Sequence, residues 1–273
     1  MIRDIYSRDA AFQKFQVLKT NRSKRHRYGQ FLVEGVRSLN QAVENGWKID
    51  SFIYPRDREL SGWARDMLKR PGEREDYRLS GELMEELSGK EDVSELMAVV
   101  RMREGGAGRF RLGPNPLLVL FDRPSNRGNL GTLLRSCDGL GADGLILTGH
   151  GVDLYDPEVV TAGMGSFFRV PAAQMELKDV MEYIAELRER FPGFKTVGTT
   201  AHKQRPVWGE DLTGPVMLML GNETDGLSYG FKQSCDVLCT IPMAESGSAS
   251  SFNVACAGTV LLYEAVRQRA ERG

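Results

Sequence analysis

The feature that most constrains the fold is a repeated alternation of short strand-like runs and amphipathic stretches from Pro116 to the end of the chain. The runs include LLVLFD, GLILTG, KTVGTT and VMLMLG, and helix-forming stretches such as DVMEYIAELRERF separate them. Short apolar runs of this kind indicate strands covered on both faces, and helices between such strands indicate parallel pairing. The C-terminal part is therefore predicted to be an α/β domain with a mostly parallel sheet. Ligands are expected where its strands end.

The N-terminal part shows a second, smaller alternation. Residues 31–104 follow the order strand, helix, strand, helix, strand, in which the second helix is a long charged stretch. The segment EGGAGRFRLGPNP then contains four glycines and two prolines and has the composition of a linker. These patterns predict a small N-terminal α/β domain at residues 1–112 and a larger domain at residues 113–273.

Charge is unevenly distributed along the chain. The formal net charge is −1 over 273 residues, which argues against a protein that coats nucleic acid through bulk charge. Residues 1–112, however, contain 22 lysines and arginines against 18 acidic residues, whereas the remainder contains 14 against 19. No apolar run reaches the roughly 18 residues of a membrane span, and the N-terminus lacks the apolar core of a secretion signal. We therefore expect a cytoplasmic protein without a membrane partner.

A basic stretch between residues 10 and 33 contains no acidic residue. Its positive side chains include Lys24, Arg25 and Arg27, which are candidates for contacting nucleic-acid phosphates, and the rings of Phe12, Phe15 and Tyr28 are candidates for base stacking. The alternative is a solvated helix face followed by a turn, and charge alone does not decide between the two.

Three polar segments follow apolar runs in the C-terminal part. The first, FDRPSNRGNLGTLLRSCDGLGADG, leaves a strand at Asp122 and enters a helix. Asn129 is expected at the helix entrance as its cap, with Arg135 at least one turn further in. The second, LMLGNETDGLSYG, has Gly221 and Glu223 directly after a strand, where site residues are expected. Taken alone, the first segment also fits a glycine-rich helix cap with its arginine in a salt bridge, and the second fits an Asx-type turn.

The third segment, TIPMAESGSASSFNVACAGTVLLYEA, is a strand, a loop of small residues and a helix that opens near Ser251 and Asn253. Backbone N–H groups ahead of a helix suit an anion or a cofactor, although a flexible loop has the same composition. The chain has no phosphate-binding GxxxxGK[ST] loop, no GxGxxG after a first strand, no GxSxG elbow and no HExxH pair. Its four cysteines form no CxxC pair, so we expect buried, reduced thiols and no metal site.

Together, and in this order, the three segments resemble the signature motifs of the SpoU family of RNA 2′-O-ribose methyltransferases. The stretch RYGQFLVEGVRSLNQAVENGWKIDSFIY is also similar to the start of the substrate-binding domain found in many family members. The resemblance implies S-adenosyl-L-methionine as methyl donor, a structured RNA substrate, a trefoil knot in the catalytic domain, and a homodimer whose active site draws residues from both chains.

The resemblance also implies roles for individual residues. The motif positions for catalysis and RNA-phosphate contact are occupied by Asn129, Arg135, Glu223, Ser251 and Asn253. The positions whose main chains usually frame the cofactor are occupied by Gly221, Ile241 and Phe252, and the family usually has leucine where this chain has Phe252. For the dimer, we expect the terminal helix to contribute an apolar face with Val260, Leu261 and Val266.

The leading hypothesis is methylation of a ribose 2′-hydroxyl in ribosomal or transfer RNA. A hydroxyl is a poor nucleophile near neutral pH, so its proton needs an acceptor. Arginine is normally always protonated. Arg135 is therefore expected to position phosphate and hydroxyl, and the proton to leave through Glu223 or water. The alternatives are a non-catalytic RNA-binding or ribosome-assembly factor that retains the fold, and a methyltransferase of small molecules.

Overall fold

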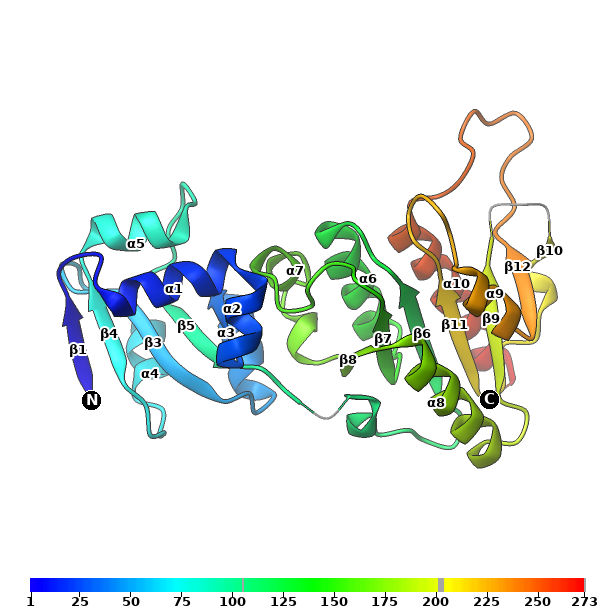
Figure 1. Ribbon diagram of the computed structural model, residues 1–273, viewed down its shortest axis with the longest axis horizontal. Coiled ribbons are helices and arrows are strands. Elements are labelled where there is room, and N and C mark those ends of the chain that lie inside the picture. Colours follow the sequence, from blue (N-terminus) through cyan, green and yellow to red (C-terminus); the bar gives the residue numbers. More distant parts are fainter. Residues whose placement is uncertain (105, 201–203, 273) are drawn as a thin grey trace. The chain divides into compact units, whose positions relative to one another are not determined.

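The computed structural model describes residues 1–104, 106–200 and 204–272 (Figure 1). Contacts divide the described residues into two compact units. The N-terminal unit contains Met1–Glu104 and Tyr155–Arg169, and the C-terminal unit contains the other described residues. Each unit has its own sheet and its own apolar core. The predicted combination of a small N-terminal α/β domain and a larger C-terminal α/β domain is confirmed.

The N-terminal unit is built on a five-stranded sheet in the order β1-β4-β3-β5-β2. Strands β1, β4 and β3 are mutually parallel, and β5 is antiparallel to both β3 and β2. The strands are β1 (Ile2–Ile5), β2 (Gln30–Glu34), β3 (Ile49–Pro55), β4 (Asp76–Leu79) and β5 (Met97–Arg101). The helical elements are α1 (Ala10–Thr20), α2 (Arg22–Tyr28), α3 (Val36–Glu44), α4 (Gly62–Leu68), α5 (Gly81–Ser88), α7 (Pro157–Ala162) and the 3₁₀ turn η2 (Ser166–Phe168).

The charged stretch before β5 differs from its prediction. It contains two helices, α4 and α5, and strand β4 between them, rather than one helical stretch. Strand β4 begins with the buried Asp76, whose carboxylate accepts hydrogen bonds from the Phe52 backbone N–H at 2.8 Å and from Arg74 Nε at 3.1 Å. The strand has the sequence DYRL and begins with a buried aspartate, so it lacks the apolar pattern by which a strand is predicted from sequence.

The segment Tyr155–Arg169 completes the core of the N-terminal unit. Its Phe167 and Phe168 rings contact both Phe31 and Trp47, with ring centroids 5.0–6.4 Å apart for these aromatic neighbours. The indole Nε1 of Trp47 also donates to the Phe168 carbonyl at 2.9 Å. A segment between two strands of the C-terminal sheet therefore supplies part of the N-terminal core.

The C-terminal unit contains a seven-stranded sheet in the order β10-β12-β9-β11-β6-β7-β8, and all of its neighbouring strands are parallel. The strands are β6 (Leu117–Asp122), β7 (Gly144–Thr148), β8 (Ala172–Met175), β9 (Lys195–Thr199), β10 (Arg205–Pro206), β11 (Val216–Leu220) and β12 (Val237–Thr240). The helical elements are η1 (Gly106–Arg109), α6 (Arg127–Gly139), α8 (Leu177–Arg190), η3 (Val207–Gly209), α9 (Tyr229–Ser234) and α10 (Val254–Arg272). The predicted parallel sheet is confirmed.

Helices cover both faces of this sheet. Helices α8 and α9 pack with Leu118, Leu120 and Met217 on one face. Alternate residues of the same strands point to the other face, where α6 and α10 lie, and the space beside Gly258 of α10 is filled by Leu133 and Leu220. Because β6, β11, β9 and β12 are parallel neighbours, the loops that follow them begin at one edge. Strand order does not define how the chain is threaded, so the trefoil knot stays a prediction.

Within the three described ranges, no helix combines the length and the apolar character that a membrane span requires.

Candidate functional site at the carboxyl edge of the parallel sheet

The first polar segment enters α6 through a cap different from the one predicted. Asn126 is the N-cap residue, and its Oδ1 accepts from the Asn129 backbone N–H at 2.9 Å. Asn129 is the third residue of the helix, so the prediction that it caps α6 is wrong. Two asparagines three residues apart both suit a cap, and only the backbone geometry decides between them. The side chain of Asn129 is consequently available for other partners.

The second polar segment is a tight turn after β11. Asn222 and Gly226 exchange backbone hydrogen bonds at 3.0 Å, and Asn222 Oδ1 accepts from the backbone N–H of Thr224 at 2.8 Å. At Gly221 an added Cβ would lie 2.0 Å from the Leu227 backbone nitrogen, so the close neighbour of this glycine is the chain's own turn. Glycine is therefore required here by packing. Its contact with a cofactor stays a prediction.

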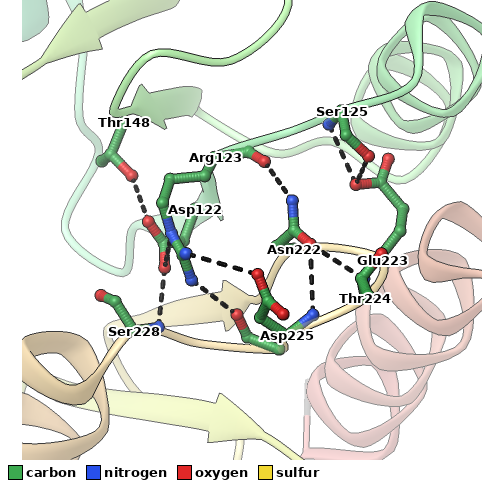
Figure 2. A network of polar contacts seen from close by, with 10 residues as sticks. Asp122, Arg123, Ser125, Thr148, Asn222, Glu223, Thr224, Asp225 and Ser228 are labelled. Carbon is green, nitrogen blue, oxygen red and sulfur yellow. Dashed lines mark hydrogen bonds and ion pairs between the residues drawn. The ribbon is translucent and has the colours of Figure 1, made fainter.

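Glu223 joins this turn to the start of α6 (Figure 2). Its carboxylate accepts from the Ser125 backbone N–H at 2.9 Å, Ser125 Oγ at 2.6 Å, the Asn126 backbone N–H at 3.1 Å and Asn129 Nδ2 at 3.1 Å. Partial burial acts to raise the pKa of Glu223, but the hydrogen bonds from Ser125 and Asn129 outweigh it, and the pKa lies below its usual value. The carboxylate is ionised at neutral pH and accepts four hydrogen bonds.

The third polar segment meets the other two through Asn253. Its Oδ1 accepts from the backbone N–H groups of Ala255 at 2.9 Å and Cys256 at 3.3 Å, at the start of α10. Its Nδ2 donates to Asn129 Oδ1 at 2.9 Å. Glu223, Asn129 and Asn253, which we call the motif network, thus form one hydrogen-bonded chain across three segments that lie far apart in the sequence.

Two predicted site residues are not part of this network. Arg135 lies on α6 with an exposed side chain, and neither a hydrogen bond nor an ion pair links it to the described residues. Ser251 is likewise exposed ahead of α10 and has no side-chain hydrogen bond with them. The structure therefore unites Asn129, Glu223 and Asn253 and leaves Arg135 and Ser251 open to solvent.

Two of the three residues predicted to frame a cofactor follow strands β11 and β12, which pair with the two sides of β9. Gly221 follows β11, Ile241 follows β12, and the exposed Phe252 precedes α10. Across residues 242–252, the one backbone–backbone hydrogen bond among the described residues runs from Gly247 N–H to the Ala244 carbonyl. Main-chain donors of this segment are thus accessible, which fits a ligand with the hydrogen-bonding edges of S-adenosylmethionine.

In the ranges that the structure describes, no group of three or more histidine, cysteine, aspartate or glutamate side chains has the arrangement of a metal site.

The predicted RNA contacts lie on α2 and differ in exposure. Arg27 is exposed and Lys24 is half-buried, but Arg25 is only 2% exposed. Arg25 Nη1 donates to the carbonyls of Leu18 at 3.2 Å and Lys19 at 3.0 Å, and Nη2 lies 3.4 Å from Asp156 Oδ2. The assignment of Arg25 as an RNA contact is corrected, because its guanidinium is taken up by internal partners.

The predicted stacking rings are corrected in the same way. Phe12 and Phe15 are buried in the core of the N-terminal unit, with 0% and 2% exposure. Tyr28 is 43% exposed, and Lys14 Nζ lies 5.2 Å from its ring centroid. Of the predicted side chains, Tyr28, Lys24 and Arg27 therefore remain at the surface, and Lys14 lies beside the Tyr28 ring.

Sequence reasoning assigned no role to several residues within the first two segments that hold the site together. Ser125 and Asn126 supply three of the four hydrogen bonds to Glu223, and Arg123 and Asn222 connect the first two segments (Figure 2). The signal available was the run of polar residues around Pro124, directly after β6. That run is indistinguishable from an ordinary turn without the second segment beside it.

Comparisons with known proteins agree with this geometry. Residues 116–263 match the model of the SpoU rRNA Methylase family, and residues 9–98 match that of the SpoU L30e-like domain. The chain is 45% identical over 269 residues to the 23S rRNA (uridine(2479)-2′-O)-methyltransferase of Streptomyces viridochromogenes, an alignment that covers 98% of this chain and 93% of the relative.

Two solved structures share the fold over nearly the whole chain. The SpoU methyltransferase AviRb from Streptomyces viridochromogenes, in complex with the cofactor AdoMet, has a TM-score of 0.91 and 44% identity, covering 96% of this chain and 99% of its own. The AdoMet-bound rRNA methyltransferase from Sinorhizobium meliloti has a TM-score of 0.84 and 26% identity, covering 97% and 98%.

Proposed function

The chain belongs to the SpoU rRNA methylase family, and from this premise we propose that it transfers a methyl group from S-adenosylmethionine to a ribose 2′-hydroxyl of ribosomal RNA. The observation that carries the proposal is the motif network, in which Glu223, Asn129 and Asn253 from three segments form one hydrogen-bonded chain at a strand edge.

Large-subunit ribosomal RNA is the substrate that the comparisons favour. The Streptomyces viridochromogenes relative, whose name specifies a uridine of 23S rRNA, aligns with both parts of this chain, including the N-terminal unit. The basic side chains of Lys14, Lys24 and Arg27 beside the exposed Tyr28 support a phosphate-binding and stacking surface on that unit. A ribosomal RNA substrate implies that the protein works in the cytoplasm.

The chemistry assigns different tasks to the site residues. S-adenosylmethionine, when bound, supplies an electrophilic methyl group on a cationic sulfur. Glu223 accepts four hydrogen bonds within the protein, so it orients Asn129 and does not take the hydroxyl proton. Arg135, an exposed cation, suits the phosphate next to the reacting ribose. Solvent water is then the group that accepts the proton of the 2′-hydroxyl.

A homodimer is part of the proposal. Leu261, predicted at the dimer face, is fully buried in the core of its own chain, and Val266 is half-buried. The exposed stripe of α10 is instead formed by Cys256, Val260 at 39% and Tyr263 at 59% exposure, which are spaced four and three residues apart. A second copy that covers this stripe would fit the family pattern of active sites built from two chains.

The test is transfer of labelled methyl from S-adenosylmethionine to an in vitro transcript of large-subunit ribosomal RNA, followed by nuclease mapping. We expect one 2′-O-methylated nucleotide and no transfer to small metabolites. If the protein binds both the cofactor and the transcript but transfers no methyl group, the non-catalytic alternative replaces the proposal. If the enzyme methylates transfer RNA and not the ribosomal transcript, the proposed substrate is wrong and transfer RNA replaces it.

A further inference from the structure

Arg123, directly after β6, has a backbone conformation unusual for its residue type. Its φ is +49°, and among the described residues only one other non-glycine residue, Met164, has a positive φ. This left-handed region costs free energy for a residue with a Cβ, and it persists where surrounding contacts determine it. Such a residue at the edge of a functional site is a reason to ask what its side chain holds.

The chain makes room for the Arg123 side chain at the end of the neighbouring strand. Gly149 follows β7, and a Cβ added there would lie 2.6 Å from Arg123 Cγ. Any other residue at position 149 would therefore displace the stem of Arg123. The stem passes over Gly149, and the guanidinium reaches the turn that follows β11.

The guanidinium contacts three groups around that turn (Figure 2). Nε donates to Asp122 Oδ2 at 3.2 Å, Nη2 donates to the Gly226 carbonyl at 3.0 Å, and Nη1 lies 3.9 Å from Asp225 Oδ2. The Asp122 side chain is 2% exposed and also accepts from Thr148 Oγ1 and the Ser228 backbone N–H, both at 2.8 Å. Arg123 thus links a buried, fully bonded carboxylate to the far end of the turn.

The backbone of Arg123 holds the other end of the same turn. Its carbonyl accepts from Asn222 Nδ2 at 2.7 Å. Glu223 follows Asn222 and precedes Gly226, so both ends of the turn that contains it are bound to one residue. The two contacts define where the Glu223 carboxylate meets Asn129.

From this geometry we propose that Arg123 is a positioning residue for methyl transfer. It clamps the turn 222–226 so that Glu223 holds Asn129 in the motif network. The role in catalysis rests on the proposed function, whereas the clamp itself is a property of the fold.

The test uses the full-length protein with Arg123→Asn. Asparagine accepts the left-handed backbone conformation but has no guanidinium, so the substitution removes the side-chain half of the clamp, at Gly226 and Asp225, without adding strain. It keeps the backbone half, the carbonyl that accepts from Asn222. We expect kcat on the ribosomal RNA transcript to fall on the order of 10–100-fold, as for a small misplacement of site residues, with the KM for the transcript unchanged. Arg123→Lys, which keeps the charge beside Asp122, should restore part of the loss.

Two control variants match the separate properties of Arg123. Met164→Asn changes the other left-handed residue and should leave kcat unchanged. Arg188→Asn removes an exposed arginine that pairs with Asp236 at 2.8 Å, and it should also leave kcat unchanged. A kcat of Arg123→Asn equal to the wild-type value would overturn the positioning role. A rise in KM without a fall in kcat would do the same, because it would make Arg123 an RNA contact.

Hydrogen–deuterium exchange separates the clamp from the proposed function. In Arg123→Asn the amides of residues 222–228 should lose protection, whereas Met164→Asn should leave them protected. Unchanged protection in Arg123→Asn would overturn the clamp whatever the activity. If the wild-type protein transfers no methyl group while the exchange result is as expected, the proposed function fails and the catalytic role of the clamp fails with it, but the clamp stands.

Discussion

The buried Arg25 provides the sharpest test of how the N-terminal unit divides its basic residues between folding and RNA binding. Arg25→Met keeps the length of the side chain and removes the guanidinium. It removes the donor to the Leu18 and Lys19 carbonyls and the guanidinium that lies 3.4 Å from the Asp156 carboxylate, which is 14% exposed. Removing one partner of a buried ion pair typically costs about 3–5 kcal/mol.

The expected cost lies at the lower end of that range. The distance from Arg25 Nη2 to Asp156 Oδ2 is 3.4 Å, which is long for an ion pair. In the variant the Asp156 carboxylate still accepts a hydrogen bond from the Glu158 backbone N–H at 3.0 Å, which reduces the cost. A loss of about 3 kcal/mol should lower the unfolding temperature of the N-terminal unit by roughly 10 °C. Tryptophan fluorescence can follow the transition, because Trp47 and Trp63 both lie in this unit.

Arg27 is the matched control, since it lies two residues further along α2 and is exposed. Arg27→Ala should leave the unfolding temperature nearly unchanged, weaken binding to the ribosomal RNA transcript, and reduce the slope of log affinity against log salt by about one unit. If Arg25→Met keeps the wild-type unfolding temperature but reduces that slope, Arg25 is a phosphate contact and the reasoning from its burial is refuted.

Three further predictions concern the C-terminal unit. Glu223→Gln should lower kcat and stability at neutral pH, since an amide cannot accept all four hydrogen bonds. The pKa of Glu223 is lower in the folded state than in the unfolded state, so the ionised carboxylate stabilises the fold. This stabilisation is complete above the unfolded pKa of about 4.3 and is lost as pH falls through the folded value. The urea midpoints of wild type and variant should therefore converge only in acid. Arg135→Ala should abolish most turnover with the cofactor affinity retained, measured by calorimetry, and near-normal turnover would contradict its assignment. Val260→Asp combined with Tyr263→Asp should reduce the mass measured by light scattering to that of a monomer and abolish methyl transfer. A variant that is monomeric and fully active would exclude the proposed dimer.

The sequence predicted strands β6, β7 and β11, in which every residue is buried. LLVLFD is buried at all six positions, and its predicted strand coincides with β6. Strand β8 was missed because AAQM has no β-branched residue and lies at a sheet edge. Strand β10 comprises two residues, too few for any periodicity.

Site prediction failed where orientation rather than residue type decides the role. Arg25 and Arg27 are two apart in one basic run, yet α2 turns the first toward the end of α1 and the second toward solvent. Asn129 was predicted to cap α6, but the backbone of the helix assigns the cap to Asn126, three residues earlier. Nothing in the local sequence around Arg123 predicted its role, because that role depends on contacts with a turn about a hundred residues further along the chain.

The hydrogen-bonding capacity left at each site residue indicates which groups meet the substrate. Glu223 accepts four hydrogen bonds, Asn129 bonds through both its oxygen and its nitrogen, and Asn253 caps α10 while it donates to Asn129. These side chains are largely committed to one another, and a substrate that displaced them would break the network that aligns three segments. Arg135 and Ser251 have no such bonds with the described residues, and both are exposed. We therefore expect Arg135 and Ser251 to contact the RNA phosphate and the ribose, and the motif network to fix the edge of the sheet against which they act.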